Sequence, residues 1–407
     1  MSFIRNHGLF FSFPQIHNFY YYYFKIYLFF YSIKEKKLMK FSCDKATLNE
    51  VVSTVQKSVS TRSNVPVLEG ILIEASTDGT LKFFGNDLDL AIESQMTATV
   101  TEPGSIVINA RFFGDVIRKL EDNIFYFQAD QECNIKMKCG SAEFSVMGIS
   151  AHEFPEIAAV EEKDSFSIPD KTLKNMIKNT IYAVCLDENK VALTGSLFEI
   201  EDGVLSVVSV DGYRLAMRKE EIESPCENQS FIIPSKVLNE VMKILKDSEN
   251  EVKIGISENK VQFEIENYKL ISRLLEGEFL NYKQILPSQS KLKVTAGVKK
   301  MSDCMERAAL MIANEGTKYP VRLSIKTDKI NVSCASRYGK MMDTAEAVTQ
   351  GDDLEIGFNY RYMLDALKAC ECETVVMEFN TPHSPCIIKP EKGDQFVYLV
   401  LPVKMKD

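Results

Sequence analysis

Three carboxylates in this chain have the chemistry to bind a catalytic metal ion. Asp87 and Asp89 stand in NDLDL, and Asp211 stands in VDGYRL. Carboxylates that share divalent cations support hydrolysis of nucleic acids, so a metal-dependent nucleic-acid enzyme is one candidate function. However, Asp87 and Asp211 occupy equivalent turns 124 residues apart in a repeating sequence. We therefore expect them to lie far apart and to have structural roles.

Other catalytic motifs are absent from the sequence. It contains no GxxxxGK[ST], HExxH or GxSxG pattern. After the first 38 residues the only histidines are His152 and His383, which leaves little for acid–base catalysis by imidazole. The ten cysteines form no CxxC pair and suggest neither a zinc module nor a disulfide framework. We expect no catalysis, no cofactor and no bound metal, and a cytoplasmic location.

Lysines recur on one face of several predicted helices. In DKTLKNMIKNTIYAV the apolar residues follow helical spacing, while Lys171, Lys174 and Lys178 gather on another face. PSKVLNEVMKILK repeats the arrangement with Lys236 and Lys243. Each such helix is expected to pack on one side and to present positive charge on the other.

The positive charge is concentrated in these helices. The windows 45–58, 110–120, 170–183, 235–246, 298–312 and 359–370 hold 16 basic and 7 acidic side chains, although the whole chain has a net charge of -9. A basic set of helices on an acidic chain indicates binding to phosphates. Lysine contacts to phosphates supply affinity without reading base sequence.

A repeat with a period near 125 residues organises the chain. FSCDKATLNEVVSTV begins at residue 41, and FSIPDKTLKNMIKNT begins at residue 166. Equivalent positions are Ala110, Ser235 and Asn359 at helix starts, and Asp87, Asp211 and Ser336 in tight turns. Many alternating segments such as VQFEIE predict short strands. We expect three mainly β domains with two helices each, at 39–160, 161–288 and 289–407.

The run NFYYYYFKIYLFFYSI at 18–33 is unlike the rest of the chain. Its apolar stretch is shorter than the roughly 20 residues that a spanning helix needs, and Lys25 interrupts it. No small-residue cleavage site of a secretory signal follows. We expect residues 1–38 to be an extension outside the fold, either disordered or the product of a misassigned start. A membrane-tethered protein is the alternative.

From Met39 onward the chain resembles the bacterial sliding clamps, the β subunits of DNA polymerase III holoenzyme. The resemblance depends on the order and spacing of MKF, VPVLEGILIE, FPEI, VDGYRLA, NYKQILP, EIGFNYRYMLDALK and YLVLPVKM. It implies an α+β fold of three clamp domains, each with two helices backed by antiparallel sheets, forming half of a six-domain ring. A head-to-tail homodimer would encircle duplex DNA, slide along it and confer processivity.

The resemblance also implies partners. A clamp-loader ATPase would open the ring, and the replicative polymerase and repair proteins would dock short hydrophobic peptides in a pocket. The subunit itself would be non-catalytic, since polymerase activity belongs to the holoenzyme as a whole.

The resemblance assigns residues to three kinds of site. The pocket would comprise Leu193, Val210, Gly212, Tyr213, Arg214, Leu215, Leu280, Gln284, Ile285, Asn359, Tyr362, Leu399, Leu401, Pro402, Val403 and Met405. Leu280 and Gln284 depart from the family pattern, which has Pro and often Arg there, and this leaves the peptide preference open. Arg62 would bind DNA together with the helix lysines, and Phe144, Leu310 and Met311 would form the subunit contact. Each of these three apolar residues is otherwise explained as core.

Overall fold

The computed structural model describes residues 39–121, 123–157, 164–222, 227–287, 289–312 and 319–405. They form two compact units: the first comprises the chain up to Phe84 with Gln95–Pro155, and the second comprises Gly85–Ser94 with the chain from Glu156 onward. The aromatic run at 18–33 and the predicted domain boundaries at 160 and 288 lie outside the described residues.

Six α-helices form three packed pairs in the described part of the chain. They are α2 (Lys45–Val55), α3 (Ala110–Lys119), α4 (Asp170–Lys178), α5 (Ser235–Ile244), α6 (Val298–Ile312) and α7 (Tyr360–Lys368). The pairs are α2 with α3, α4 with α5 and α6 with α7.

The predicted helix starts at Ala110 and Ser235 are observed, but Asn359 precedes its helix by one residue. Its side-chain Oδ1 accepts a hydrogen bond from the Arg361 N–H at 2.9 Å. Asparagine caps a helix well because its side chain satisfies an amide that has no partner inside the helix. Tyr360, the first residue of α7, therefore stands where Ala110 and Ser235 stand in the other repeats.

The strands of the first unit form antiparallel ladders. They are β1 (Met39–Asp44), β2 (Gly70–Ala75), β3 (Thr80–Asn86), β5 (Thr99–Glu102), β6 (Gly104–Asn109), β7 (Ile124–Ala129), β8 (Asn134–Cys139) and β9 (Ala142–Met147). One sheet has the order β5-β1-β7-β8-β9, and β2 pairs with both β3 and β6. β9 is thus an edge strand.

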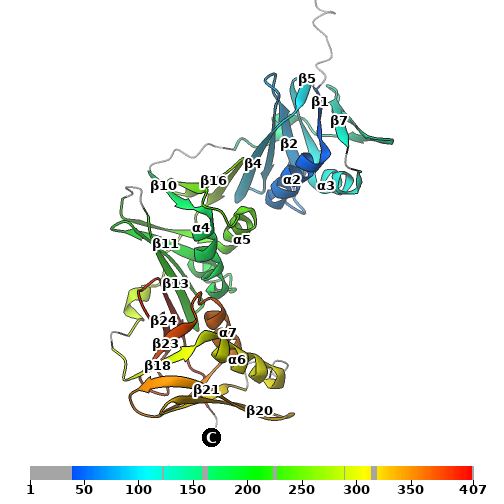
Figure 1. Cartoon of the computed structure of the whole chain (residues 1–407). Coiled ribbons are helices and arrows are strands. Elements are labelled where there is room, and N and C mark those ends of the chain that lie inside the picture. Colours follow the sequence, from blue (N-terminus) through cyan, green and yellow to red (C-terminus); the bar gives the residue numbers. More distant parts are fainter. Residues whose placement is uncertain are drawn as a thin grey trace, which may run out of the picture. The chain divides into compact units, whose positions relative to one another are not determined.

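In the second unit, one ladder has the order β10-β15-β16-β17 and continues to residues 90–94 of β4. A larger sheet has the order β14-β11-β12-β13-β25-β24-β23-β18-β21-β20-β19-β22. The strands of the first ladder are β4 (Leu90–Thr97), β10 (Asp164–Pro169), β15 (Glu251–Ile256), β16 (Lys260–Ile265) and β17 (Tyr268–Arg273). Those of the larger sheet are β11 (Gly195–Glu201), β12 (Val204–Val210), β13 (Arg214–Glu221), β14 (Gln229–Pro234), β18 (Leu292–Gly297), β19 (Val321–Lys326), β20 (Lys329–Ser336), β21 (Gly339–Gln350), β22 (Leu354–Phe358), β23 (Thr374–Phe379), β24 (Cys386–Pro390) and β25 (Phe396–Val400). In the same unit, α4 and α5 lie beside β11 and β13, and α6 lies between β18 and the β20–β21 hairpin (Figure 1).

The repeat is visible in three β-hairpin turns, each of which contains the same kind of side-chain hydrogen bond. Asp87 Oδ1 accepts from the Asp89 N–H at 3.1 Å, and Asp211 Oδ1 accepts from the Tyr213 N–H at 2.8 Å. In the third turn Ser336 Oγ accepts from the Tyr338 N–H at 3.2 Å. Short polar side chains that bond to the amide two residues on favour tight turns.

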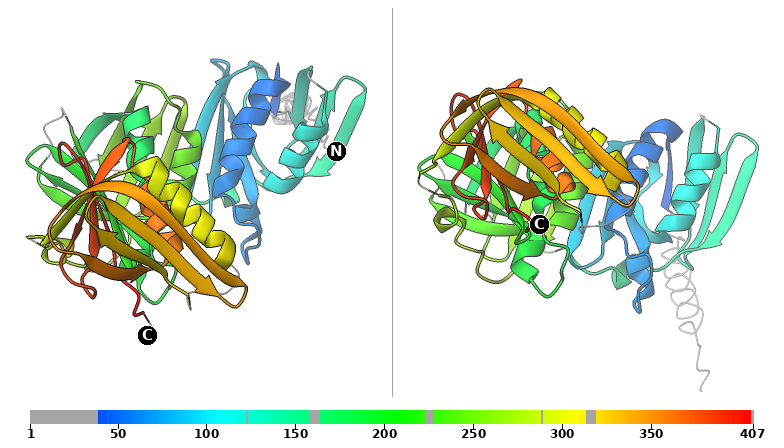
Figure 2. Two further views of the ribbon diagram at one scale, coloured as in Figure 1. Left: turned by 60° about the horizontal axis from the view of Figure 1, so that its bottom comes forward. Right: turned by 90° about the horizontal axis from the view of Figure 1, so that it is seen from below.

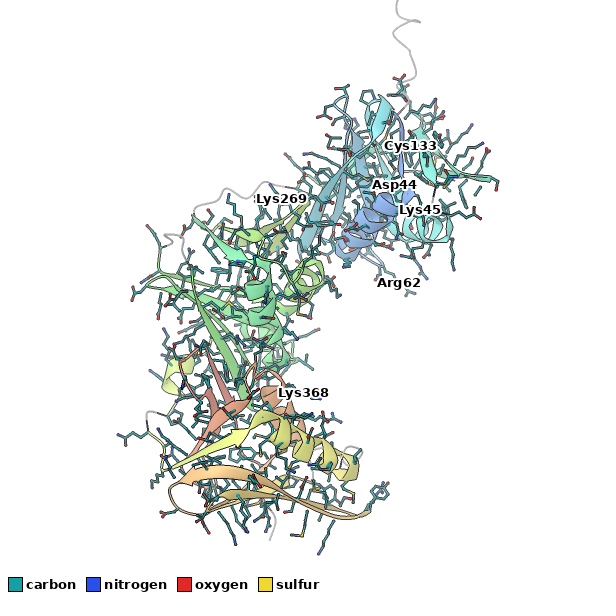
Figure 3. All side chains as sticks on the ribbon, viewed as in Figure 1. Asp44, Lys45, Arg62, Cys133, Lys269 and Lys368 are labelled. Atoms are coloured by element: carbon teal, nitrogen blue, oxygen red, sulfur yellow. The ribbon has the colours of Figure 1, made fainter. Side chains whose placement is uncertain are left out.

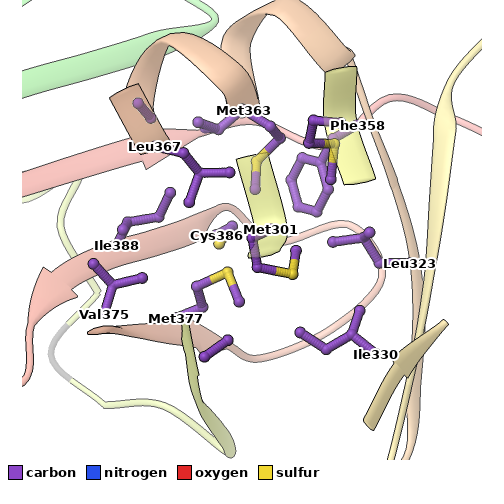
Figure 4. Packing of buried hydrophobic residues seen from close by; sticks show 14 of the residues in the cluster. Met301, Leu323, Ile330, Phe358, Met363, Leu367, Val375, Met377, Cys386 and Ile388 are labelled. Atoms are coloured by element: carbon purple, nitrogen blue, oxygen red, sulfur yellow. The ribbon is translucent and has the colours of Figure 1, made fainter. Parts of the chain in front are cut away.

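The core of the third repeat shows how the amphipathic patterns are buried. Met301 on α6 and Met363 on α7 lie over alternating strand residues such as Leu323 and Met377 (Figure 4). All four side chains are fully buried. Such close-packed apolar burial is the main source of stability for the scaffold that holds the surface sites.

Candidate functional site

The helix α4 has the two faces expected from its sequence. Leu173, Met176 and Ile177 are fully buried. Lys171 and Lys178 are exposed and make no ion pair within the described residues. Lys174 is half-buried, and its Nζ lies 3.2 Å from Asp247 Oδ1. Two of the three predicted phosphate-binding lysines are therefore available to a ligand without breaking an ion pair.

The lysines of α5 both have acidic neighbours. Lys236 Nζ lies 2.5 Å from Asp87 Oδ2, and Lys243 Nζ lies 2.7 Å from Glu240 Oε1. Both lysine side chains are more than half exposed, whereas Asp87 and Glu240 are only 10% and 15% exposed. Each ammonium group is therefore still open to a ligand from the solvent side. The pairing with Asp87 was not predictable because the two residues are 149 positions apart.

Arg62 lies in a loop of the first unit, between two short 3-10 helices, Gln56–Ser58 and Pro66–Glu69. Its side chain is exposed and projects away from the ribbon (Figure 3). This placement is compatible with a contact to a backbone phosphate.

Several apolar residues predicted for the peptide pocket belong to one cluster, which is formed by segments far apart in the sequence. Val210, Leu215 and Leu399 are buried in one cluster, and Leu193 and Leu401 pack at its margin. Leu215 pairs with Leu399 across β13 and β25, which explains how residues from two repeats meet. Sequence reasoning missed Phe279 and Leu286, which pack against the same cluster. Both are apolar and adjacent in sequence to the predicted residues Leu280 and Ile285, and this could have indicated that they belong to the pocket.

The C-terminal tail, residues 401–405, runs along this region. The Leu401 N–H donates to the Tyr213 carbonyl at 2.9 Å, and the Val403 N–H donates to the Gly357 carbonyl at 2.8 Å. Met405 lies against Gly357, where an added Cβ would be 2.8 Å from Met405 Cγ. Gly357 therefore allows the tail to lie close to β22. Pro402 lies between the two hydrogen-bonded residues, Leu401 and Val403.

Two tyrosines form an aromatic wall beside the tail. The rings of Tyr213 and Tyr362 stack with their centroids 6.2 Å apart. Tyr213 is 62% exposed, whereas Tyr362 is half-buried and burial raises its pKa. Gly212, at a φ of 93° in the preceding turn, adopts the left-handed backbone that glycine accommodates without strain. Asn359 caps the helix that carries Tyr362.

The guanidinium of Arg214 is already occupied by groups of the chain. It donates to Asp211 Oδ2 at 3.0 Å, to Asp365 Oδ2 at 2.5 Å and to the Tyr182 carbonyl at 2.6 Å. It also lies over the Tyr362 ring, 4.5 Å from the centroid. Its role here is to hold Tyr362 and the hairpin in place, and Asp365 is a supporting residue that sequence reasoning missed.

The remaining pocket residues lie near a short 3-10 helix, Tyr282–Gln284. Leu280 and Ile285 are 44% and 36% exposed, and Gln284 is exposed. Leu280 also lines a cavity of about 660 Å³. Tyr282 O–H donates to Glu199 Oε2 at 2.5 Å, which fixes this helix against β11.

Of the residues expected at the subunit contact, Phe144 lies on an edge strand, and Leu310 and Met311 lie on the helix α6. Phe144 is half-buried on the edge strand β9, where Met147 is 70% exposed. Leu310 is 84% exposed on α6, which lies along the β20–β21 hairpin (Figure 2). Met311 Cε is 3.4 Å from the position of a Cβ at Gly339. Met342 on β21 is 83% exposed.

Residues 339–343 of β21 pair with β20 on one side, while none of the described strands pairs with them on the other. Asp343 in this segment forms an ion pair with Arg307 of α6, and the Nε–Oδ2 distance is 2.7 Å. Hydrogen bonding by Arg307 lowers the pKa of Asp343 to about 2. The free edge therefore carries an ion pair to α6 beside the exposed side chain of Met342.

The three candidate metal-binding carboxylates do not converge on a shared site. Asp87 and Asp211 accept hydrogen bonds within their own turns and form ion pairs with Lys236 and Arg214. Over the residues that the structure describes, no group of three His, Cys, Asp or Glu side chains could hold a metal ion. A search of the same residues for a helix long and apolar enough to span a membrane is also negative.

Comparison with known proteins identifies relatives along almost the whole described chain. Models of the N-terminal, central and C-terminal domains of the DNA polymerase III beta subunit match residues 39–158, 167–281 and 283–404. The Beta sliding clamp of Bacillus subtilis is 36% identical over 379 residues, which cover 90% of this chain and all of that protein. The Beta sliding clamp of Staphylococcus epidermidis is 31% identical over 377 residues, with the same coverage.

Solved structures give the same result. The DNA polymerase sliding clamp from Bacillus subtilis has a TM-score of 0.87 at 35% identity. The DNA polymerase III beta subunit from Thermotoga maritima has a TM-score of 0.82 at 26% identity. Each match covers 90% of this chain and 100% of the compared chain.

Proposed function

Because the chain belongs to the DNA polymerase III beta subunit family, we propose that it is a sliding clamp that confers processivity on the replicative polymerase. Two copies form a ring that encircles duplex DNA and slides without reading sequence. The observation that carries this function is the threefold repeat, since each repeat matches a different domain of the family in the family's order. We assign the domains to 39–160, 161–288 and 289–407.

The repeat also supports a head-to-tail dimer. Within the chain, residues 90–94 of β4 pair with β17, and β13 pairs with β25. In each contact, the strand that follows the tight turn of one repeat (β4 or β13) pairs with the last strand of the next repeat (β17 or β25). The equivalent strands left over are β21 and β9, and both have an open edge. Two copies that pair β21 with β9 satisfy both edges and close a ring of six domains.

The register of this contact follows from the two contacts inside the chain. Ser94 pairs with Tyr268, the first residue of β17, and Arg218 pairs with Phe396, the first residue of β25. The third equivalent of Ser94 and Arg218 is Asp343, because each stands seven residues after its turn residue, Asp87, Asp211 or Ser336.

By the same rule, Ala142, the first residue of β9, pairs with Asp343 of the partner subunit. Phe144 then lies opposite the partner's Met341. In the single chain, Phe144 pairs with buried Met137 and Met341 pairs with buried Cys334, so both side chains point to the helix-covered face. The two apolar side chains therefore lie on the same, helix-covered face. Directly opposed side chains on one face of an antiparallel pair contact each other.

DNA binding is assigned to Arg62 and to the helix lysines, Lys171, Lys174, Lys178, Lys236 and Lys243. All of them except the half-buried Lys174 are exposed, which supports a role in phosphate contact. Contacts of this kind are strong enough in sum to hold DNA, yet they carry no base information and permit sliding.

Partners dock peptides on the cluster formed by Val210, Leu215 and Leu399 and its neighbours on the tail and α7. Aliphatic floors flanked by aromatic rings accept leucine or phenylalanine anchors. Beyond the replicative polymerase, we propose that the clamp-loader ATPase and repair proteins use the same pocket, and that the protein acts in the cytoplasm.

The subunit is non-catalytic, and polymerase activity belongs to the holoenzyme that it tethers. A metal-dependent nucleic-acid enzyme is not favoured, because Asp87 and Asp211 lie in separate turns and each forms an ion pair, with Lys236 and Arg214 respectively. Turnover of nucleic acid by the purified chain that is lost on Asp87→Ala would restore that alternative.

A mass determination at micromolar concentration tests the assembly. Multi-angle light scattering should give twice the 46.1 kDa of the chain. The same measurement on a chain that starts at Met39 should also give a dimer. A monomer at this concentration would contradict the ring.

A further inference from the structure

A second concave surface lies next to the C-terminal tail in the third repeat. This cavity of about 520 Å³, which we call the tail groove, lies between the tail and the β19–β21 sheet. Arg322 of β19, Lys340 of β21 and Lys404 of the tail line it, together with Met342 and Met405. It combines three cations with thioether side chains that can adapt to a ligand.

The sign of the charge sets the tail groove apart from the chain as a whole. No carboxylate lines the groove among the described residues, although the chain has a net charge of -9. Arg322 forms an exposed ion pair with Glu355, in which the Nη1–Oε2 distance is 3.5 Å. Lys340 and Lys404 make no ion pair within the described residues. The groove is therefore complementary to an acidic ligand.

The tail groove and the proposed peptide pocket have Met405 in common. The same five-residue tail bonds to the Tyr213 carbonyl through Leu401 and to the Gly357 carbonyl through Val403. It then places Met405 at the groove. A peptide whose apolar anchors occupy the pocket has only to extend past the tail to reach Arg322.

We propose that the tail groove binds an acidic segment of the partner peptide that flanks its apolar anchors. This inference rests on the proposed peptide pocket and adds to it a selection for charge. Exposed ion pairs are individually weak, so the groove discriminates between partners that share similar anchors and contributes little to the affinity of the anchors themselves.

The test uses the full-length protein and three fluorescein-labelled peptides in a polarisation titration. All three carry the same apolar core with leucine and phenylalanine anchors, and two add three glutamates, one after the core and one before it. We expect one acidic peptide to bind about two- to tenfold more tightly than the core alone at low salt. The gain should disappear in about 1 M salt, where the screening length is about 3 Å.

Arg322→Glu is the informative variant, because Lys340 also lies on the proposed subunit edge. It should abolish the gain from the acidic segment and leave the affinity for the core peptide unchanged. Lys326→Glu is the matched control: it lies four residues along the same strand, is exposed and makes the same charge change outside the groove. The control should retain the gain.

The outcomes separate the two proposals. If the core peptide binds but neither acidic segment adds affinity, or if the gain survives Arg322→Glu, the tail groove is refuted and the pocket stands. If no peptide binds, the pocket itself is refuted and the groove with it.

Discussion

Leu310→Ser should weaken the dimer, and its effect can be estimated from the exposed surface. Leu310 is 84% exposed in the single chain, so nearly the whole side chain is available for burial against a partner. Burying a leucine side chain is worth about 1.5–3 kcal/mol. A two-subunit ring contains two identical contacts, so the substitution acts twice and removes about 3–6 kcal/mol. Each 1.4 kcal/mol is tenfold, so the dissociation constant should rise by about 10² to 10⁴.

Leu186 provides a matched control for this prediction. It is 92% exposed and lies outside the proposed contact, so Leu186→Ser removes a similar side chain without touching either strand edge. Sedimentation over a dilution series gives the dissociation constant of each variant, and circular dichroism checks that both remain folded. Equal dissociation constants for the two variants would refute the placement of Leu310 at the subunit contact.

Three further predictions concern charge and the N-terminal residues. Lys178→Glu should weaken DNA binding for all sequences alike and should reduce the salt dependence of the affinity, measured by titration at several salt concentrations; an unchanged salt slope would contradict a phosphate contact. Because Arg307 lowers the pKa of Asp343 from 3.8 to about 2, the stabilisation is present above about pH 4 and is lost as the pH falls toward 2. Asp343→Asn should therefore flatten the pH dependence of the unfolding free energy in that acidic window only, as urea titrations can test; an unaltered slope would count against the ion pair. Removal of residues 1–38 should leave both the dimer mass and DNA retention unchanged, and loss of either would assign that segment a role in the ring.

The sequence was sufficient to predict the repeated architecture because the pattern of each element is local. Leu173, Met176 and Ile177 are spaced so that one face of α4 must be buried, and they are fully buried. The same reasoning placed helix starts at Ala110 and Ser235. It missed by one residue at Asn359, because an asparagine that caps a helix has the same local pattern as a first helical residue.

The site was harder to predict because its contacts join distant residues. The resemblance assigned Arg214 to the pocket, but it gave no sign that Asp365, which is 151 positions away, and the Tyr182 carbonyl hold its guanidinium. Lys236 similarly meets Asp87 through folding alone. Spacing along the chain contains no information on such pairs, whereas the open edges at β9 and β21 became evident once the strand order was known.

Retention on closed DNA tests the central claim most directly. The protein is loaded on a nicked circular plasmid with its loader and ATP, separated from free protein by gel filtration, and the plasmid is then linearised by a restriction enzyme. A ring that encircles DNA should remain on the circle and slide off the linear form, with little dependence on salt. Equal retention on both forms would contradict topological binding and, with it, the assignment of the repeated domains to a closed clamp.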